Sequence, residues 1–359
     1  VILANRAHYA RLQPILLEIH KSKNLELDII SSGSLPLEDF GRAEDYIRDD
    51  GFNIVGRSFS HVAGSTNLSM AQSIGLGVIN YSTVLAQTKP DLLILHADRY
   101  ETLATAVAAA CMNVCTLHVM GGETTGTVDE YFRHAITKLA DYHLPATEQS
   151  ARNIVQMGEP KSTILHVGCP GSDLAANVRS KNLKKREDLL ILYHPVTSTP
   201  KKSYTEMITI LETALATGRK ATVLTPNYDA GATLVHRAID EVAVGNFKIV
   251  SDLPAPKYLE LLSTCSCAVG NSSSFVRDGS FFGTPSVVVG TRQNGREASD
   301  NVMTVKKVEK DTLAHAIAYQ LDHGQYPDST LYGCGDVAET IVPQLETISL
   351  FSQKKSTFA

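Results

Sequence analysis

The chain of 359 residues carries 20% charged residues and a formal net charge of −5, and it is long enough for two domains of ordinary size. This composition excludes a broad basic surface for nucleic acid or anionic lipid, and no apolar run resembles a signal peptide or a membrane span of roughly 20 residues. The cysteines show no disulfide-framework spacing, so we expect a cytoplasmic protein with buried free thiols at Cys111, Cys115, Cys265 and Cys267.

The first half of the chain alternates short apolar runs with helical patterns. Strands are predicted at residues 1–4, 25–31, 52–60, 92–95, 114–119, 142–145 and 163–167. Helices are predicted at residues 8–21, within 35–50, from 67 to 87, between 95 and 114, from 127 onward and at 148–157. Parallel strands joined by helices in this way form a doubly wound α/β domain, which we place at residues 1–170.

A second alternating series follows a boundary expected at residues 168–171 and in the basic, irregular stretch 177–186. Its strands are predicted at residues 189–193, 221–225, 248–250, 266–269 and 286–289, and its helices at 203–217, 232–244, 255–263 and 273–282. We therefore predict a second Rossmann-like domain at residues 187–336 and a helix at 337–351 that crosses back to the first domain. Two such domains with a cleft between them form the GT-B arrangement.

Charged residues follow two neighbouring strands of the first half. Asp98 and Arg99 come after the strand at 92–95, and Glu123 comes after the strand at 114–119. Ligands bind at the carboxyl ends of parallel strands, so these side chains are expected at a ligand site. Asp129 and Arg133 lie one turn apart at the start of the next helix. Three carboxylates and two arginines at one edge predict an acid/base site for an anionic substrate.

Structural explanations compete with this interpretation at two positions. Residues 127–130 match a capping box, which favours a structural role for Glu130 and leaves Asp129 as the better catalytic candidate. Arg133 is also explained as a simple i,i+4 partner of Asp129. The glycines at 121 and 122 allow a ligand to approach the backbone closely, which favours a working role for Glu123.

The second half carries a candidate phosphate site. Asn271, Ser272 and Ser273 follow an apolar strand and open a helix, and Asp278 lies one to two turns further on. Backbone N–H groups and hydroxyls at a helix start suit a diphosphate. The alternative is that Ser272 or Ser273 is only an N-cap.

One further candidate residue follows the first strand of each half: Arg6 in the first and His194 in the second. His194 is placed to donate to a phosphate or to shuttle a proton, or simply to bond the backbone at a strand end. Arg6 either reaches the diphosphate across the cleft or covers the helix surface. No P-loop occurs, no GxGxxG follows the first strand and no His/Cys set has metal spacing, so neither a metal nor a nicotinamide cofactor is predicted.

Seven motifs appear in order along the chain: residues 96–99 (HADR), 121–123 (GGE), 127–138 (TVDEYFRHAITK), 194–197 (HPVT), 226–231 (PNYDAG), 270–273 (GNSS) and 290–297 (GTRQNGRE). In their order and spacing they resemble the hydrolysing UDP-N-acetylglucosamine 2-epimerases. The resemblance covers nearly the whole chain, and its nearest branch is the one that feeds sialic acid synthesis, including the epimerase half of the bifunctional animal enzyme.

The resemblance implies a GT-B fold, a UDP-sugar substrate, UDP as product, no cofactor, and a homodimer or homotetramer. In the implied reaction UDP leaves as the C2 proton is removed, and water then adds to the 2-acetamidoglucal. By resemblance, Asp98 and Asp129 match catalytic carboxylates and His194 matches the histidine of the second domain. The matching nucleotide contacts are Arg6, Ser272, Ser273 and Asp278, with Asn271 beside them, and the sugar and phosphate contacts are Arg99, Arg133, Asn227 and Arg292.

Four places depart from the family pattern. One is the feedback site of the animal enzyme for CMP-sialic acid, which uses two arginines one turn apart: Arg237 matches the first, but Asp240 replaces the second, which speaks against that regulation here. Met120 stands where a catalytic Glu is common, so either Glu123 takes that role or the activity or the sugar differs. His8 replaces an acidic residue of the opening motif. Phe275 replaces a glycine at the start of the phosphate-binding helix and predicts a tighter pocket.

The leading hypothesis is hydrolysis and C2 inversion of UDP-N-acetylglucosamine to N-acetylmannosamine and UDP, for sialic acid synthesis. One alternative is the same chemistry on a UDP- or GDP-linked 2,4-diacetamido-trideoxy sugar. A GT-B glycosyltransferase is disfavoured by the clustered carboxylates, because it needs an acceptor groove instead. A nucleotide-sugar binder that lost catalysis with the Glu-to-Met difference is the remaining alternative.

Overall fold

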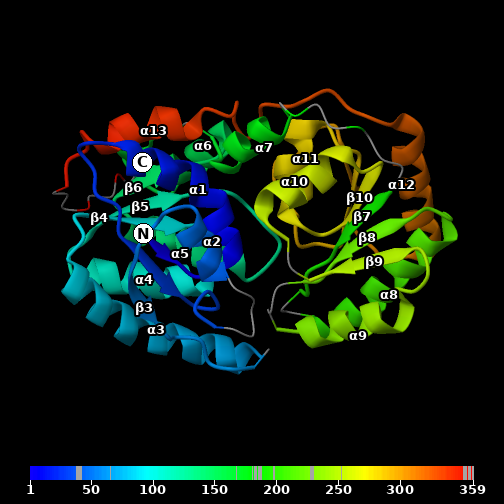
Figure 1. The fold of residues 1–359 in the computed structure, drawn as a ribbon, viewed down its shortest axis with the longest axis horizontal. Coiled ribbons are helices and arrows are strands. Elements are labelled where there is room, and N and C mark those ends of the chain that lie inside the picture. The colour runs from blue at the N-terminus through cyan, green and yellow to red at the C-terminus, as the bar shows by residue number, and fades with distance from the viewer. Residues whose placement is uncertain are drawn as a thin grey trace.

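The computed structural model describes residues 1–37, 43–64, 66–166, 168–179, 181, 184, 188–196, 199–226, 230–251, 253–350, 354 and 357. Two α/β units lie side by side, and Figure 1 shows the first in blue to green and the second in green to orange. Each unit has parallel strands covered by helices, as the alternating sequence pattern predicts.

In the described residues the first half is built on six parallel strands: β1 (Ile2–Leu3), β2 (Ile29–Ser32), β3 (Ile54–Ser58), β4 (Leu92–His96), β5 (Cys115–Val119) and β6 (Tyr142–Leu144). Hydrogen bonds join them in the orders β1-β2-β3 and β4-β5-β6, and β1 lies against β4. The switch in strand order therefore falls between β1 and β4. The helices are α1 (Arg6–Lys21), α2 (Ala43–Asp49), α3 (Asn67–Thr88), α4 (Tyr100–Cys111), α5 (Asp129–Leu139) and α6 (Glu148–Gln156).

The strand predicted at residues 163–167 is wrong for the residues that the structure describes there. Lys161–Thr163 form a 3₁₀ turn, and Ile164 makes one isolated bridge to His143 of β6. Because β6 is only three residues long, its outer edge offers little length for another strand to pair with. The prediction of a buried thiol at Cys111 is also wrong, because Cys111 is exposed as the last residue of α4. Cys115, Cys265 and Cys267 are buried as expected.

As far as the structure describes it, the second half forms a six-stranded parallel sheet in the order β12-β11-β10-β7-β8-β9. Its strands are β7 (Leu189–Leu192), β8 (Ala221–Leu224), β9 (Phe247–Val250), β10 (Cys267–Gly270), β11 (Ser286–Val289) and β12 (Val302–Val305). The helices are α8 (Pro200–Ala216), α9 (Ala232–Val242), α10 (Ala255–Thr264), α11 (Ser273–Phe282) and α12 (Lys310–His323). The order reverses between β7 and β10, which is where a doubly wound sheet places its ligand.

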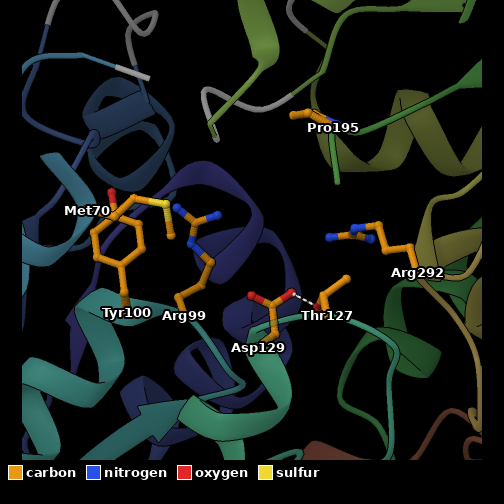
Figure 2. A pocket seen from close by; sticks show the side chains of 7 residues that line it. All are labelled: Met70, Arg99, Tyr100, Thr127, Asp129, Pro195 and Arg292. Carbon is orange, nitrogen blue, oxygen red and sulfur yellow. Dashed lines mark hydrogen bonds between the residues drawn. The ribbon is translucent and has the colours of Figure 1, made fainter. Parts of the chain in front are cut away.

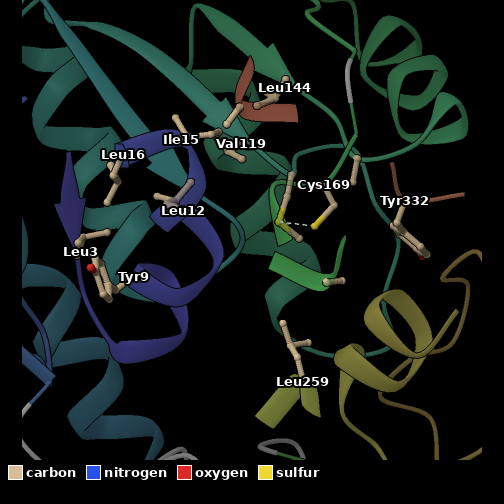
Figure 3. Packing of buried hydrophobic residues seen from close by; sticks show 14 of the residues in the cluster. Leu3, Tyr9, Leu12, Ile15, Leu16, Val119, Leu144, Cys169, Leu259 and Tyr332 are labelled. Atoms are coloured by element: carbon tan, nitrogen blue, oxygen red, sulfur yellow. Dashed lines mark hydrogen bonds between the residues drawn. The ribbon is translucent and has the colours of Figure 1, made fainter. Parts of the chain in front are cut away.

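Two helices join the halves. α7 (Gly171–Arg179) contacts α1 of the first half and both α10 and α11 of the second, and α13 (Val337–Leu345) packs against α1 and α7. The sequence indicates an irregular stretch from residue 177, but α7 continues to Arg179. One buried apolar cluster runs through this junction, from Leu12 of α1 past Cys169 to Leu259 of α10 (Figure 3). The domain limits expected from the sequence stay predictions.

Candidate active site

The switch points of the two sheets open onto one cleft. Its volume is about 460 Å³, and residues from both halves line it. Seven of the candidate residues lie on its wall: Arg6, Arg99, His194, Ser272, Ser273, Asp278 and Arg292. Six of them sit just after a strand or at the start of a helix, as the rule on carboxyl ends of parallel strands predicts, and Asp278 lies in the middle of α11. Asn227 and Thr197 lie outside the described residues.

Asp98 is presented by a strained backbone at the end of β4. Ala97 has a φ of +57°, which is left-handed and costly for a residue with a side chain. The imidazole of His118 on β5 holds this turn, because its Nε2 donates to the carbonyl of Ala97 at 2.8 Å while its Nδ1 accepts from Thr137 Oγ1 at 3.1 Å. Burial lowers the pKa of His118 to about 3, so the ring stays neutral.

Arg133 of α5 is buried and forms an ion pair with Asp98. Its Nη2 donates to the Asp98 carboxylate, and its Nη1 donates to Glu130 Oε2 at 2.6 Å and to the main-chain oxygen of Glu123 at 3.0 Å. Burial alone raises the pKa of Asp98, but Arg133, then Arg296 and Arg277, outweigh it and hold that pKa well below its usual range. A simple i,i+4 pair of Arg133 with Asp129 does not account for these contacts.

The capping box predicted at residues 127–130 does not form. α5 begins at Asp129, its N-cap is Val128, and no side chain caps it. Thr127 Oγ1 instead donates to Asp129 Oδ2 at 2.8 Å, because the helix begins later than the motif predicts. Glu130 is structural for another reason: its carboxylate accepts from Thr125 N at 2.7 Å and pairs with Arg133.

Asp129 faces open space. It lines a small pocket that shares Arg99, Tyr100 and Arg292 with the main cleft. Figure 2 shows the Asp129 carboxylate, bonded to Thr127, pointing into the gap between Arg99 of the first half and Arg292 of the second. A ligand held between these two arginines would lie against Asp129, which suits proton transfer to or from an anionic substrate.

Glu123 lies elsewhere. Its side chain is buried and forms ion pairs with Arg277 of α11 and with Arg296, and it lines neither pocket. The two preceding glycines are explained by the protein's own packing. A Cβ on Gly122 would lie 2.3 Å from the carbonyl oxygen of Ser150, and one on Gly121 would lie 2.7 Å from His118 Nδ1. Packing within the chain therefore explains both glycines, and the approach of a ligand to this pair stays a prediction.

Met120 takes the place at the end of β5 where the resemblance leads us to expect a catalytic glutamate. It has a left-handed φ of +66° and is 1% exposed. Its Sδ lies 3.8 Å from Cys169 Sγ, inside the cluster that joins the halves. The side chain thus acts as core packing. His8 is buried too: its ring packs edge-on against His96, and burial lowers its pKa to about 4.

Asn271 and Ser272 build the second-half edge. The Asn271 side chain is buried and clamps His194, accepting from its N and donating to its O, each at 2.7 Å. Ser272 is the N-cap of α11 and accepts from Ser274 N at 3.3 Å, and because it also lines the cleft, its role as a nucleotide contact stays a prediction. Phe275 is wholly buried in the core and does not line the cleft, so the tighter pocket predicted from it is wrong.

Asp278 crosses between the halves at the cleft wall. Its carboxylate accepts from Arg11 Nη1 at 2.5 Å and Nη2 at 2.9 Å, and from Ser274 Oγ. Sequence reasoning missed Arg11, Arg277 and Arg296 as site residues. Arg296 lies within a recognised motif, but nothing in the local pattern of Arg11 or Arg277 predicts a partner more than 150 residues away.

Within the described ranges, no group of three or more His, Cys, Asp or Glu residues is arranged to hold a metal ion. The same part of the chain contains no helix that is long and apolar enough to cross a membrane.

Solved structures share this fold. The crystal structure of UDP-GlcNAc 2-epimerase from Neisseria meningitidis bound to UDP-GlcNAc superposes with a TM-score of 0.79 over 96% of this chain and 98% of that chain, at 14% identity. The Methanocaldococcus jannaschii UDP-GlcNAc 2-epimerase in complex with UDP-GlcNAc and UDP gives the same TM-score and coverage at 18% identity. These likenesses confirm the GT-B fold of two Rossmann-like units.

Sequence relatives give the family. A Legionella pneumophila protein named UDP-N,N'-diacetylbacillosamine 2-epimerase (hydrolyzing) is 33% identical over 98% of this chain and 96% of its own. A Neisseria meningitidis UDP-N-acetylglucosamine 2-epimerase is 26% identical over 99% of this chain and 97% of its own. Both are bacterial proteins, and neither is the animal enzyme to which the motifs pointed. The profile of the UDP-N-acetylglucosamine 2-epimerases matches residues 17–346, and this chain belongs to that family.

Proposed function

We propose that this protein is a hydrolysing 2-epimerase that acts on a UDP-linked 2,4-diacetamido-2,4,6-trideoxy sugar. The observation that carries the proposal is the 33% identity, over nearly the whole chain, with the Legionella protein named for UDP-N,N'-diacetylbacillosamine. A Campylobacter jejuni protein named GDP/UDP-N,N'-diacetylbacillosamine 2-epimerase (hydrolyzing) supports it at 29% identity over 84% of this chain and 83% of its own. The geometry fits, because Asp129 lines a small pocket that shares Arg99 and Arg292 with the cleft, and Ser272 and Ser273 at the start of α11 line that cleft.

In the first step a base takes the proton from C2 of the sugar and the bond between C1 and the diphosphate oxygen breaks. The electron pair of the C–H bond forms the C1–C2 double bond, and UDP leaves with the electron pair of the C–O bond. The developing charge on the diphosphate needs cations and hydrogen-bond donors. Arg6, His194 and Arg292, with the hydroxyls of Ser272 and Ser273, line the cleft where such a group would lie.

In the second step water adds to the unsaturated sugar. Its oxygen bonds to C1, its proton passes to a protein base, and a proton from the opposite face bonds to C2, which gives the free sugar with inverted C2. Two carboxylates on different elements suit this exchange of proton roles. Asp129 on α5 lines the small pocket. Asp98 after β4 lines neither pocket, but its side chain is 20% exposed, and Arg133 holds it ionised. We assign the proton transfers to this pair.

The experiment is a comparison of kcat/KM for UDP-N,N'-diacetylbacillosamine and for UDP-N-acetylglucosamine on the same preparation, with UDP release as the signal. The proposal predicts a ratio of about 10 or more in favour of the diacetamido sugar. A ratio below one would overturn the substrate assignment. UDP binding without release from either sugar would support the non-catalytic alternative and overturn the enzyme.

UDP-N-acetylglucosamine is the second candidate substrate. It is favoured by the Neisseria meningitidis relative, which matches 99% of this chain. Sialic acid synthesis, the pathway expected from the sequence, would require this substrate and stays a prediction, as do the homodimer or homotetramer and the cytoplasmic location.

A further inference from the structure

Glu123 belongs to the first half but is held by the second. It is 4% exposed, and its carboxylate pairs with two arginines, Arg277 of α11 and Arg296 after β11. A carboxylate so placed is screened from any ligand in the cleft. It is poorly suited to carry a proton, because two cations strongly favour its charged form.

Further hydrogen bonds connect Glu123 and Arg277 to Ser273 in the second half and to Asp98 in the first. Arg277 Nη1 donates to Ser273 Oγ at 3.4 Å, and Ser273 lines the cleft at the start of α11. On the opposite side, the main-chain oxygen of Glu123 accepts from Arg133, whose other nitrogen holds Asp98. A continuous polar path therefore runs from the helix start of the second half to a carboxylate of the first.

Glu123 has a second arginine partner, which allows Arg277 to move away from it. Breaking a buried ion pair is costly when it leaves a charge without a partner. Glu123 has two arginines, so Arg277 can turn toward a diphosphate at Ser273 while Arg296 keeps the carboxylate paired. The positive charges of Arg296 and Arg277 also act on Asp98, because both favour its ionised form and so lower its pKa.

We propose that Glu123 and Arg277 are positioning residues that couple occupancy of the diphosphate site at Ser273 to the alignment of Asp98. The proposal rests on the proposed function, because it takes the diphosphate of a UDP-sugar to bind at the start of α11. Glu123 then touches no reacting atom. It therefore does not replace the catalytic glutamate that is common in the family at the position of Met120.

The first test needs no turnover. Glu123→Gln, Arg277→Met and the double variant form a double-mutant cycle, measured by urea unfolding with and without saturating UDP. The coupling between the two side chains is expected to fall by about half or more when UDP is bound, because Arg277 then shares its charge with the diphosphate. Coupling that UDP leaves unchanged, or the absence of UDP binding by the wild type, would overturn the proposal.

The second test uses the UDP-sugar that the wild type turns over best. Each single variant is expected to lower kcat about 10- to 100-fold, and the double variant to fall no more than about 3-fold further, because both changes break the same path. UDP affinity should stay within about 3-fold, Arg277→Lys should restore part of kcat, and the acid limb of the kcat profile should move to higher pH in Arg277→Met.

Other results would contradict the coupling. A loss of UDP affinity of about 10-fold or more in Arg277→Met with unchanged kcat would make Arg277 a direct diphosphate ligand. A lower melting temperature with unchanged kcat in the single variants would show that the ion pairs are only structural. Losses of kcat that multiply in the double variant would show that Glu123 and Arg277 act independently. Arg152→Met removes an exposed arginine of α6 that pairs with Glu148, and it is the control for the substitution itself. Inactivity of the wild type on both UDP-sugars would count against the proposed function, while the unfolding cycle would still judge the coupling.

Discussion

The two halves share one sheet plan and use its ligand edge differently. In the first half the edge carries charged groups that hold one another, with Asp98 bound by Arg133, and its turns are strained at Ala97 and Met120. In the second half the edge carries small polar groups, with Ser272 capping α11 and Ser273 facing the cleft. We propose from this difference that the charged strand ends of the first half serve proton transfer and that the start of α11 serves binding.

The largest effect is expected from the charged edge. Asp98→Asn and Asp129→Asn should each lower kcat about 100-fold or more while UDP affinity stays within about 3-fold. Asp98→Asn should also cost about 1–3 kcal/mol of unfolding free energy, because it leaves the buried Arg133 with fewer charged partners. Steady-state kinetics, calorimetry and urea unfolding check these values. Asp322→Asn, on the exposed surface of α12, is the matched control, and near wild-type rates in both variants would refute this site.

The buried histidines of the first half should make its stability depend on pH. Burial lowers the pKa of His8 to about 4 and that of His118 to about 3, below the unfolded value of about 6.5. Between these values the unfolded chain binds more protons, so stability rises with pH and falls on acidification. Urea unfolding at pH 7 and pH 5 should differ by about 2 kcal/mol for each ring. His8→Phe should remove its share, and an undiminished slope in that variant would contradict the assignment.

A charge placed at the binding edge should act on affinity. Ser273→Asp should weaken UDP binding about 10-fold or more, because its carboxylate repels the diphosphate, with a smaller change in kcat. The protein should still fold, since a negative charge at a helix N-terminus is stabilising. Titration calorimetry measures the affinity, and Ser273→Ala controls for the lost hydroxyl. Unchanged UDP affinity in Ser273→Asp would move the diphosphate site away from α11.

The smallest effect on activity is expected where the family glutamate is missing. Met120→Glu puts a carboxylate into the apolar junction beside Cys169, so it should destabilise the protein by about 1–3 kcal/mol and raise kcat by no more than about 3-fold. Met120→Leu, which keeps the volume, is the control. A gain of about 10-fold or more in Met120→Glu would show that the present side chains do not replace that group.

Local patterns predicted most of the fold. Apolar runs located eleven of the twelve strands in the described residues, and the motifs placed Asp98, Asp129, His194 and Ser273 at strand ends or helix starts. β12 and α12 were missed, because the strand is a short, partly exposed edge and the helix has a polar surface. α7 was missed because its role lies in contacts with helices of both halves, which no local pattern encodes.

The candidate site was predictable only where a residue's role follows from its position in its own element. Glu123 was expected to work on the substrate because it follows a strand, but its partners Arg277 and Arg296 come from 154 and 173 residues further on. The same holds for Asp278 and Arg11, which are 267 residues apart. Burial and ion pairing across the halves are tertiary properties, so the sequence alone could not show that Glu123 is buried and paired with two arginines.

The most direct test of the central claim is the reaction of the wild-type protein with UDP-N,N'-diacetylbacillosamine in D₂O, followed by NMR. Elimination and hydration predict UDP and a free sugar with inverted C2 that carries deuterium at that carbon. UDP release without deuterium at C2, or retention of the C2 configuration, would contradict proton transfer at this carbon and with it the assigned role of the charged edge.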